Sequence, residues 1–156
     1  MTRVAGQLTI DAPVHEVFDL VADERNEPRY NSRIARAEKV SAGPVGPGTR
    51  FVAVPRGMGG RGELTVTIVE YARPHRLRTV VRSAYLRVDG TLTFADVEGR
   101  TRLEWDWDMC LAGPMRLLSP LLALVAPRWE RRNWVGLRAY VESGRPGARP
   151  ARRPLR

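Results

Sequence analysis

Cysteine and histidine are scarce in this chain of 156 residues. It has one cysteine, Cys110, and two histidines, His15 and His75. A single cysteine excludes an internal disulfide and a multi-cysteine metal site. Neither histidine has a partner at metal-ligand spacing, and no serine or cysteine lies in a nucleophile motif. We therefore predict no metal, no cofactor and no catalytic residue of these kinds.

Long hydrophobic runs are also absent. The most apolar stretch, MRLLSPLLALVA (115–126), is interrupted by Arg116, Ser119 and Pro120 and is shorter than the roughly 18 residues of a membrane span. The first residues, MTRVAGQLTIDAP, contain no apolar segment of signal-peptide type. We therefore expect a cytoplasmic protein. An apolar content of 43% and a charged content of 28% suit one globular domain, which we place at residues 1–143.

Lysine is nearly missing, since Lys39 is the only one, so the formal net charge of +9 is carried by arginine. Five arginines and no acid follow Gly144, in the segment GRPGARPARRPLR. Its Pro, Gly and Arg content predicts a disordered tail over residues 144–156 with no specific nucleic-acid partner. A weak contact of this basic tail with a membrane surface stays open as an alternative.

Residues 3–111 are predicted to form a strand, two short helices and then a series of strands. Val14, Val17, Phe18 and Val21 form an amphipathic stripe, with Asp11 as the expected helix cap. DERNEPRYN (23–31) predicts a short second helix or turn. Alternating patterns and turn residues then predict further strands at 34–40, 49–55, 63–71, 76–83, from 86, and at 101–111.

The last of these strands, TRLEWDWDMCL, has the clearest alternation. Its apolar residues, Trp105 and Trp107 among them, fall on one face, and Glu104, Asp106 and Asp108 fall on the other. We expect these acids to pair with arginines on the outer face of an antiparallel sheet rather than to serve in acid–base chemistry. The inner, apolar face of that sheet must be covered by another element.

A C-terminal helix over 127–143, PRWERRNWVGLRAYVES, is the element that fits. Pro127 suits its first turn and Gly144 its C-terminal cap. Helical spacing places Trp129, Asn133, Leu137 and Tyr140 on one face, with Trp134 at its edge. The preceding residues, 113–126, are predicted to be helical in two pieces bent at the prolines.

Several segments resemble the START-like superfamily. Their local sequences are most similar to its bacterial polyketide cyclase/dehydrase and lipid-transport (SRPBCC) branch. They are IDAPVHEVFDLVAD (10–23), RNEPRYN (25–31), GPVGPGTRF (43–51), TIVEYARPHRL (67–77), GTLTF (90–94) and RLEWDWD (102–108). The resemblance implies an α+β helix-grip fold, in which a curved antiparallel sheet wraps around a long C-terminal helix. It also implies a deep cavity between them for an apolar ligand. Pro127 departs from the pattern, because it interrupts what such proteins keep as one helix.

The aromatic residues are the candidates for lining that cavity. Residue type alone leaves core filling and cavity lining open, and the resemblance favours a cavity with Asn133 and Tyr30 as its polar groups. The predicted ligand-binding residues are Tyr30, Phe51, Trp105, Trp107, Asn133, Trp134, Leu137 and Tyr140.

These observations lead to a first hypothesis and two alternatives. The first is a module that binds a small hydrophobic ligand, lipid-, polyketide- or quinone-like. The second is a cyclase or dehydratase in the same cavity, with Tyr30 or Asn133 orienting a carbonyl; the lack of an inward His, Asp or Glu argues against it. The third is an interaction protein, in which the apolar face of residues 117–125 and the arginine tail contact a membrane or a macromolecule.

Overall fold

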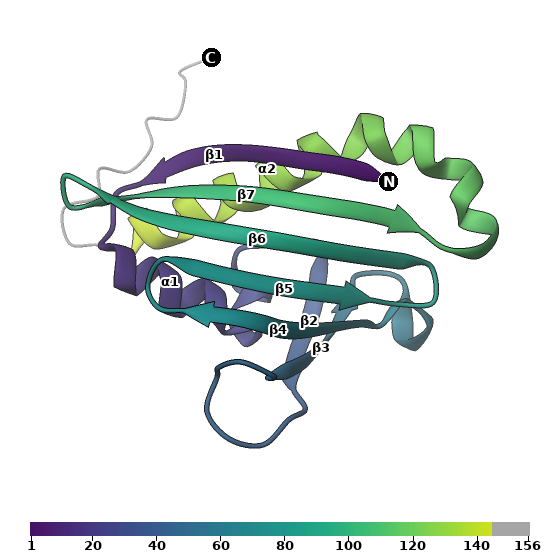
Figure 1. Cartoon of the computed structure of the whole chain (residues 1–156), viewed down its shortest axis with the longest axis horizontal. Coiled ribbons are helices and arrows are strands. Elements are labelled where there is room, and N and C mark those ends of the chain that lie inside the picture. Colours follow the sequence, from purple (N-terminus) through teal and green to yellow (C-terminus); the bar gives the residue numbers. More distant parts are fainter. Residues whose placement is uncertain (145–156) are drawn as a thin grey trace, which may run out of the picture.

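A computed structural model describes residues 1–144, so the predicted tail beyond Gly144 lies outside the described residues. It contains seven strands, two α-helices and three short 3-10 helices (η) (Figure 1). The elements in chain order are β1 (Thr2–Ile10), α1 (Val14–Ala22), η1 (Glu24–Arg29), β2 (Ile34–Lys39), β3 (Arg50–Pro55), η2 (Gly59–Gly62), β4 (Leu64–Ala72), β5 (Arg76–Arg82), β6 (Leu86–Val97), β7 (Arg100–Leu111), η3 (Gly113–Leu118) and α2 (Ser119–Ser143).

All seven strands form one antiparallel sheet in the order β1-β7-β6-β5-β4-β3-β2. The first strand therefore returns to pair with the last, from Thr2 opposite Met109 to Ile10 opposite Thr101. The helices lie behind this sheet in Figure 1, and α2 runs beside β1. The predicted α+β helix-grip fold is confirmed.

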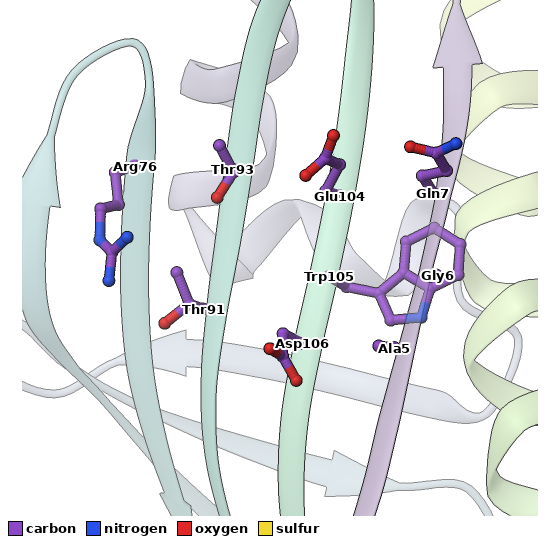
Figure 2. Close-up of a pocket in the computed structure, with 9 residues that line it drawn as sticks. All are labelled: Ala5, Gly6, Gln7, Arg76, Thr91, Thr93, Glu104, Trp105 and Asp106. Carbon is purple, nitrogen blue, oxygen red and sulfur yellow. The ribbon is translucent and has the colours of Figure 1, made fainter.

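The alternation predicted for β7 is also confirmed. Trp105 and Trp107 are buried on the inner face, whereas Asp106 accepts two hydrogen bonds from Arg3 of β1 at 2.9 and 2.7 Å on the outer face. Glu104 pairs with Arg102 at 2.9 Å. Figure 2 shows this outer face, where a shallow groove of about 560 Å³ lies across β1, β7, β6 and β5.

The C-terminal helix begins earlier than predicted, whereas it ends at Ser143 as predicted. α2 begins at Ser119 rather than at Pro127 and is continuous for 25 residues. Pro127 removes one hydrogen bond, the one that would reach the carbonyl of Ala123, and both residues are exposed, so water can solvate that carbonyl. Gly144 follows the helix, but its φ of −81° is not the left-handed conformation of a glycine cap.

The first helix is also capped differently than predicted. Pro13, not Asp11, occupies the N-cap position of α1, and no side chain caps it. The backbone N–H of Asp11 instead donates to Glu142 near the end of α2 at 3.0 Å. This bond fixes the end of α2 to the junction between β1 and α1.

The buried face of α2 is rotated from the predicted one. Trp134 and Leu137 are buried, whereas Trp129 is 42% exposed and Tyr140 is 36% exposed. The rotation brings Gly136 against η1, where a Cβ atom would lie 2.4 Å from the carbonyl oxygen of Tyr30. Only glycine permits this approach, which sets the distance between α2 and η1.

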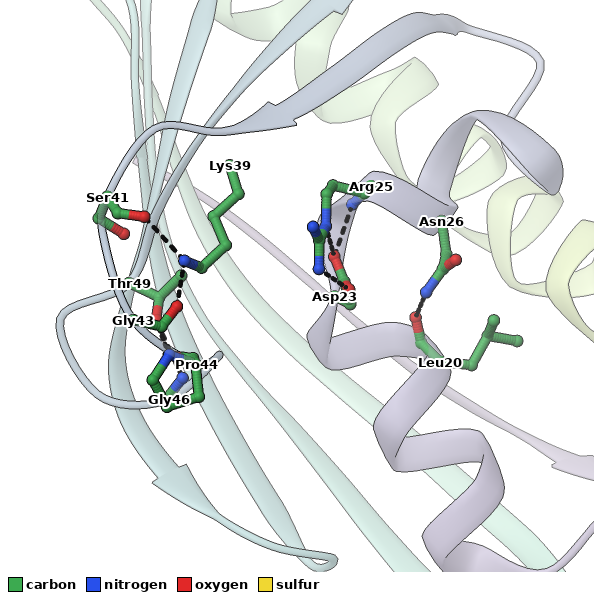
Figure 3. A network of polar contacts seen from close by, with 10 residues as sticks. All are labelled: Leu20, Asp23, Arg25, Asn26, Lys39, Ser41, Gly43, Pro44, Gly46 and Thr49. Atoms are coloured by element: carbon green, nitrogen blue, oxygen red, sulfur yellow. Dashed lines mark hydrogen bonds and ion pairs between the residues drawn. The ribbon is translucent and has the colours of Figure 1, made fainter.

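Polar contacts fix η1 relative to the elements around it (Figure 3). Asp23 accepts a hydrogen bond from the backbone N–H of Arg25 at 3.2 Å and so caps η1. Asn26 donates to the carbonyl of Leu20 in α1 at 3.1 Å. The same view shows Lys39 donating to the carbonyls of Ser41 and Gly43 after β2.

Candidate ligand-binding cavity

Three tryptophans hold α2 away from the middle of the sheet. The Trp134 ring lies 6.0 Å from that of Trp105 and 6.4 Å from that of Trp107, nearly parallel to the latter at 20°. The two β7 indoles lie over glycines of the flanking strands. A Cβ at Gly6 would lie 2.3 Å from Trp105, and one at Gly90 would lie 1.3 Å from Trp107. We expected the rings of Trp105, Trp107, Trp134 and Tyr140 to converge; the three tryptophans do so, whereas Tyr140 does not.

Beside the tryptophans lies a cavity of about 730 Å³, between the inner face of the sheet, η1 and α2. Its volume lies in the range typical of small-molecule sites, roughly 300–1,000 Å³. Most of its wall is aliphatic, with contributions from Val88, Leu92, Met109, Leu122 and Val125. Such a wall favours a ligand with a mainly apolar body.

Half of the predicted site residues line this cavity, namely Tyr30, Trp107, Asn133 and Trp134. The other four lie outside its lining. Phe51 and Leu137 are fully buried in the core. The Trp105 indole lies flat over Gly6 of β1 (Figure 2), and the Tyr140 hydroxyl accepts from Arg29 at 3.4 Å on the exposed side of α2.

Three glutamates also line the cavity: Glu24 and Glu27 of η1, and Glu130 of α2. The expectation that no acid faces inward was therefore wrong. Residues three apart in a 3-10 helix lie one above the other, so Glu24 and Glu27 are neighbours. The sequence signal is the E-x-x-E spacing, which becomes informative only once residues 24–29 are known to be 3-10 helical.

The Glu130 carboxyl group is held at the tryptophans. The indole N–H of Trp107 donates to its Oε2 at 2.9 Å. Burial raises the pKa of Glu130 to about 7, and the charge of Glu27 adds to the rise. The hydrogen bond from Trp107 and the charge of Arg33 lower this pKa in part, as does the indole N–H of Trp134, which lies close to the carboxyl group without a hydrogen bond of normal geometry. Glu130 is therefore close to half-protonated at neutral pH.

The two glutamates of η1 influence each other and the neighbouring tyrosine. Burial raises the pKa of Glu24 well above its ordinary value, and the charge of Glu27 and a hydrogen bond between the two carboxyl groups add to the rise. Burial also raises the pKa of Tyr30, as do the charges of Glu27 and Glu24. Asn31 holds Glu27 in place through a hydrogen bond of 2.8 Å. Burial and the charge of Glu27 thus favour the neutral form of the Glu24 carboxyl group at this end of the cavity.

Two buried polar atoms in the cavity wall have no hydrogen-bond partner among the residues that the structure describes. They are the side-chain oxygen of Asn133 and the indole nitrogen of Trp134. Both residues lie one turn after Glu130 on α2, at spacings of three and four, so they flank its carboxyl group. Unpartnered buried polar atoms are rare in native proteins.

The opposite end of the cavity reaches the surface between η3, the start of α2 and the loop around η2. Met115, Leu118 and Leu121 line this end and are exposed, as is Met58 of the loop. The hydroxyl group of Tyr85 contacts the Met58 sulfur at 3.6 Å across it. Figure 1 shows the chain curving past the end of β7 here.

No helix within residues 1–144 is long and apolar enough to cross a membrane. Within the same residues, no group of three or more His, Cys, Asp or Glu side chains is arranged to hold a metal ion.

The curved seven-stranded sheet, the long C-terminal helix and the cavity between them define a START-like, helix-grip protein. The chain belongs to the family described as polyketide cyclase / dehydrase and lipid transport, which it matches over residues 1–142. No curated protein matches the chain in sequence.

Solved structures share the fold at low sequence identity. The protein TTHA0849 from Thermus thermophilus is 22% identical with a TM-score of 0.76, over 92% of this chain and 99% of that one. A START superfamily protein from Mycobacterium smegmatis is 14% identical with the same TM-score and coverage. The di-domain ARO/CYC BexL from the BE-7585A biosynthetic pathway is 19% identical with a TM-score of 0.70, over 91% of this chain and 47% of that one.

Proposed function

We propose that the protein binds a small hydrophobic ligand, lipid-, polyketide- or quinone-like, in the cavity between the sheet and α2. The observation that carries this proposal is the cavity of about 730 Å³ with its largely aliphatic wall. Membership of a family whose description includes lipid transport supports it. The exposed apolar end near Leu121 gives such a ligand a route from the surface.

A chain-length series tests this proposal. Trp107, Trp129 and Trp134 line the cavity, so bound ligand should change the tryptophan fluorescence. Each buried CH₂ group contributes about 0.8 kcal/mol. The dissociation constants of linear alcohols from C8 to C12 should therefore fall about fourfold per added carbon. Affinities that do not depend on chain length, or no saturable signal with any alcohol, would count against the proposal.

A second candidate function, a cyclase or dehydratase in the same cavity, is favoured by the inward acids. A carboxyl group with a pKa of about 7 suits general acid–base catalysis at neutral pH. In a dehydration, the Glu27 carboxylate would take a proton from the carbon beside a carbonyl. The Glu130 acid would give its proton to the departing hydroxyl, which leaves as water while a C=C bond forms.

A substitution separates the two functions. Glu130→Gln keeps the shape of the side chain but cannot supply the proton, so turnover of a β-hydroxy ketone should be lost while its binding is kept. Mass spectrometry detects the loss of water from the substrate. If Glu130→Gln and wild type dehydrate the substrate at equal rates, Glu130 has no such role.

A further inference from the structure

The two unpartnered atoms of α2 differ in what they require. The indole nitrogen of Trp134 is a donor only, and its side chain is 4% exposed. The side-chain oxygen of Asn133 is an acceptor. Both residues line the cavity and flank Glu130 on the same turn of α2. A ligand group that satisfies both atoms must accept one hydrogen bond and donate another.

The acids around this point disfavour an anionic group. Glu24, Glu27 and Glu130 face it from η1 and α2. The two arginines of the cavity lining are exposed and engaged elsewhere. Arg33 lies over the ring of Trp129 at 4.2 Å, and Arg56 donates to the carbonyl of Ser32 at 3.0 Å. A carboxylate or phosphate would therefore meet three acids, and Arg33, whose charge reaches Glu130, is exposed and lies over the ring of Trp129.

A cationic group fits the acids but not the indole. An ammonium group donates hydrogen bonds and accepts none, so it leaves the Trp134 N–H unpartnered. An ether or ketone accepts from Trp134 but donates nothing to Asn133. A hydroxyl group does both.

We propose that the ligand is an apolar molecule with a hydroxyl group, an alcohol or phenol, whose oxygen accepts from the indole N–H of Trp134 and whose proton is donated to the side-chain oxygen of Asn133. This proposal rests on the proposed ligand-binding function and names the ligand class of the same cavity. The apolar body then extends along Val88, Leu122 and Val125 toward the exposed end.

Ligands that share one dodecyl chain and differ in the head group test this directly. We would titrate 1-dodecanol, dodecyl methyl ether, dodecylammonium and dodecanoate by tryptophan fluorescence and calorimetry. We expect dodecanol to bind about tenfold more tightly than the ether, the effect of one buried hydrogen bond. Dodecanoate should bind most weakly.

Two variants separate the two hydrogen bonds. Asn133→Leu removes the acceptor, so the alcohol should lose about tenfold while the ether is unchanged and the two affinities become equal. Trp134→Phe removes the donor, so alcohol and ether should weaken by the same factor. Tyr140→Phe, on the exposed side of the same helix, is the matched control and should change neither. Because each ratio is measured on one protein preparation, partial misfolding of a variant cancels.

The outcomes distinguish this proposal from the function on which it rests. If dodecylammonium or dodecanoate binds more tightly than dodecanol, or if alcohol and ether bind wild type equally, the hydroxyl subsite is refuted while ligand binding stands. If none of the four molecules binds, the proposed function fails as well.

Discussion

The substitution Asn133→Leu should stabilise the ligand-free protein, although most substitutions of buried residues destabilise. The Asn133 oxygen is buried without a partner in the described residues, and such an atom costs about 1–3 kcal/mol of desolvation. Leucine has nearly the same size and no polar atom. The free energy of unfolding should therefore rise by about 1–3 kcal/mol, which raises the melting temperature by roughly 3–9 °C at this chain length.

Urea denaturation measures this change, and Asn31→Leu is the matched control. Asn31 donates to Glu27 at 2.8 Å and accepts from the backbone N–H of Arg33 at 3.1 Å, so its replacement should cost about 1–3 kcal/mol. If Asn133→Leu destabilises the protein as much as Asn31→Leu does, the Asn133 amide is satisfied in solution. The reasoning behind the hydroxyl subsite would then be refuted.

Two further predictions concern the tryptophan and carboxyl groups of the cavity. Folding raises the pKa of Glu130 from its ordinary 4.5 to about 7, so the native state binds more protons than the unfolded state between these pH values. The stability that this group contributes is therefore full below pH 4.5 and is lost as the pH rises through 7. The wild-type unfolding free energy minus that of Glu130→Gln should thus fall by up to about 3 kcal/mol between pH 4.5 and 8, and a constant difference would contradict the burial of this acid. Gly90→Ala places a Cβ 1.3 Å from Trp107, so it should destabilise by about 1–3 kcal/mol and change the near-UV circular dichroism of the indoles. Gly46→Ala, with no heavy atom within 4 Å, should stay within about 0.5 kcal/mol, and equal effects of the two would contradict the packing described.

Alternation and turn residues predicted the sheet because each strand has one buried and one exposed face. TRLEWDWDMCL was predicted as a strand and forms β7, since strict period-2 patterning over this length does not fit a helix. Pro127 misled the prediction of α2, because local propensity places proline at a helix start. In the fold, the helix continues through Pro127, and the carbonyl that loses its hydrogen bond faces solvent.

The cavity lining was only partly predictable, because it also depends on contacts between segments that are distant in the sequence. The convergence of Trp105, Trp107 and Trp134 follows from one strand and one helix, each with a clear periodicity. Tyr140 was misplaced because the rotation of α2 depends on Gly136 approaching the Tyr30 carbonyl, a contact between distant segments. Glu24 and Glu27 were missed because charged residues in a short polar segment suggest a solvated surface until the fold encloses them. Glu130 was missed because the predicted buried face of α2, through Trp129 and Tyr140, did not include it.

A cavity-filling variant tests the central claim most directly. Val88 of β6 is buried and lines the cavity, whereas Val69 of β4 is exposed and lies outside its lining. Fluorescence titration with 1-dodecanol should give saturable binding to wild type and to Val69→Phe, and binding at least about tenfold weaker to Val88→Phe, because the added ring occupies the ligand's space. Equal affinities of all three proteins would contradict binding in this cavity.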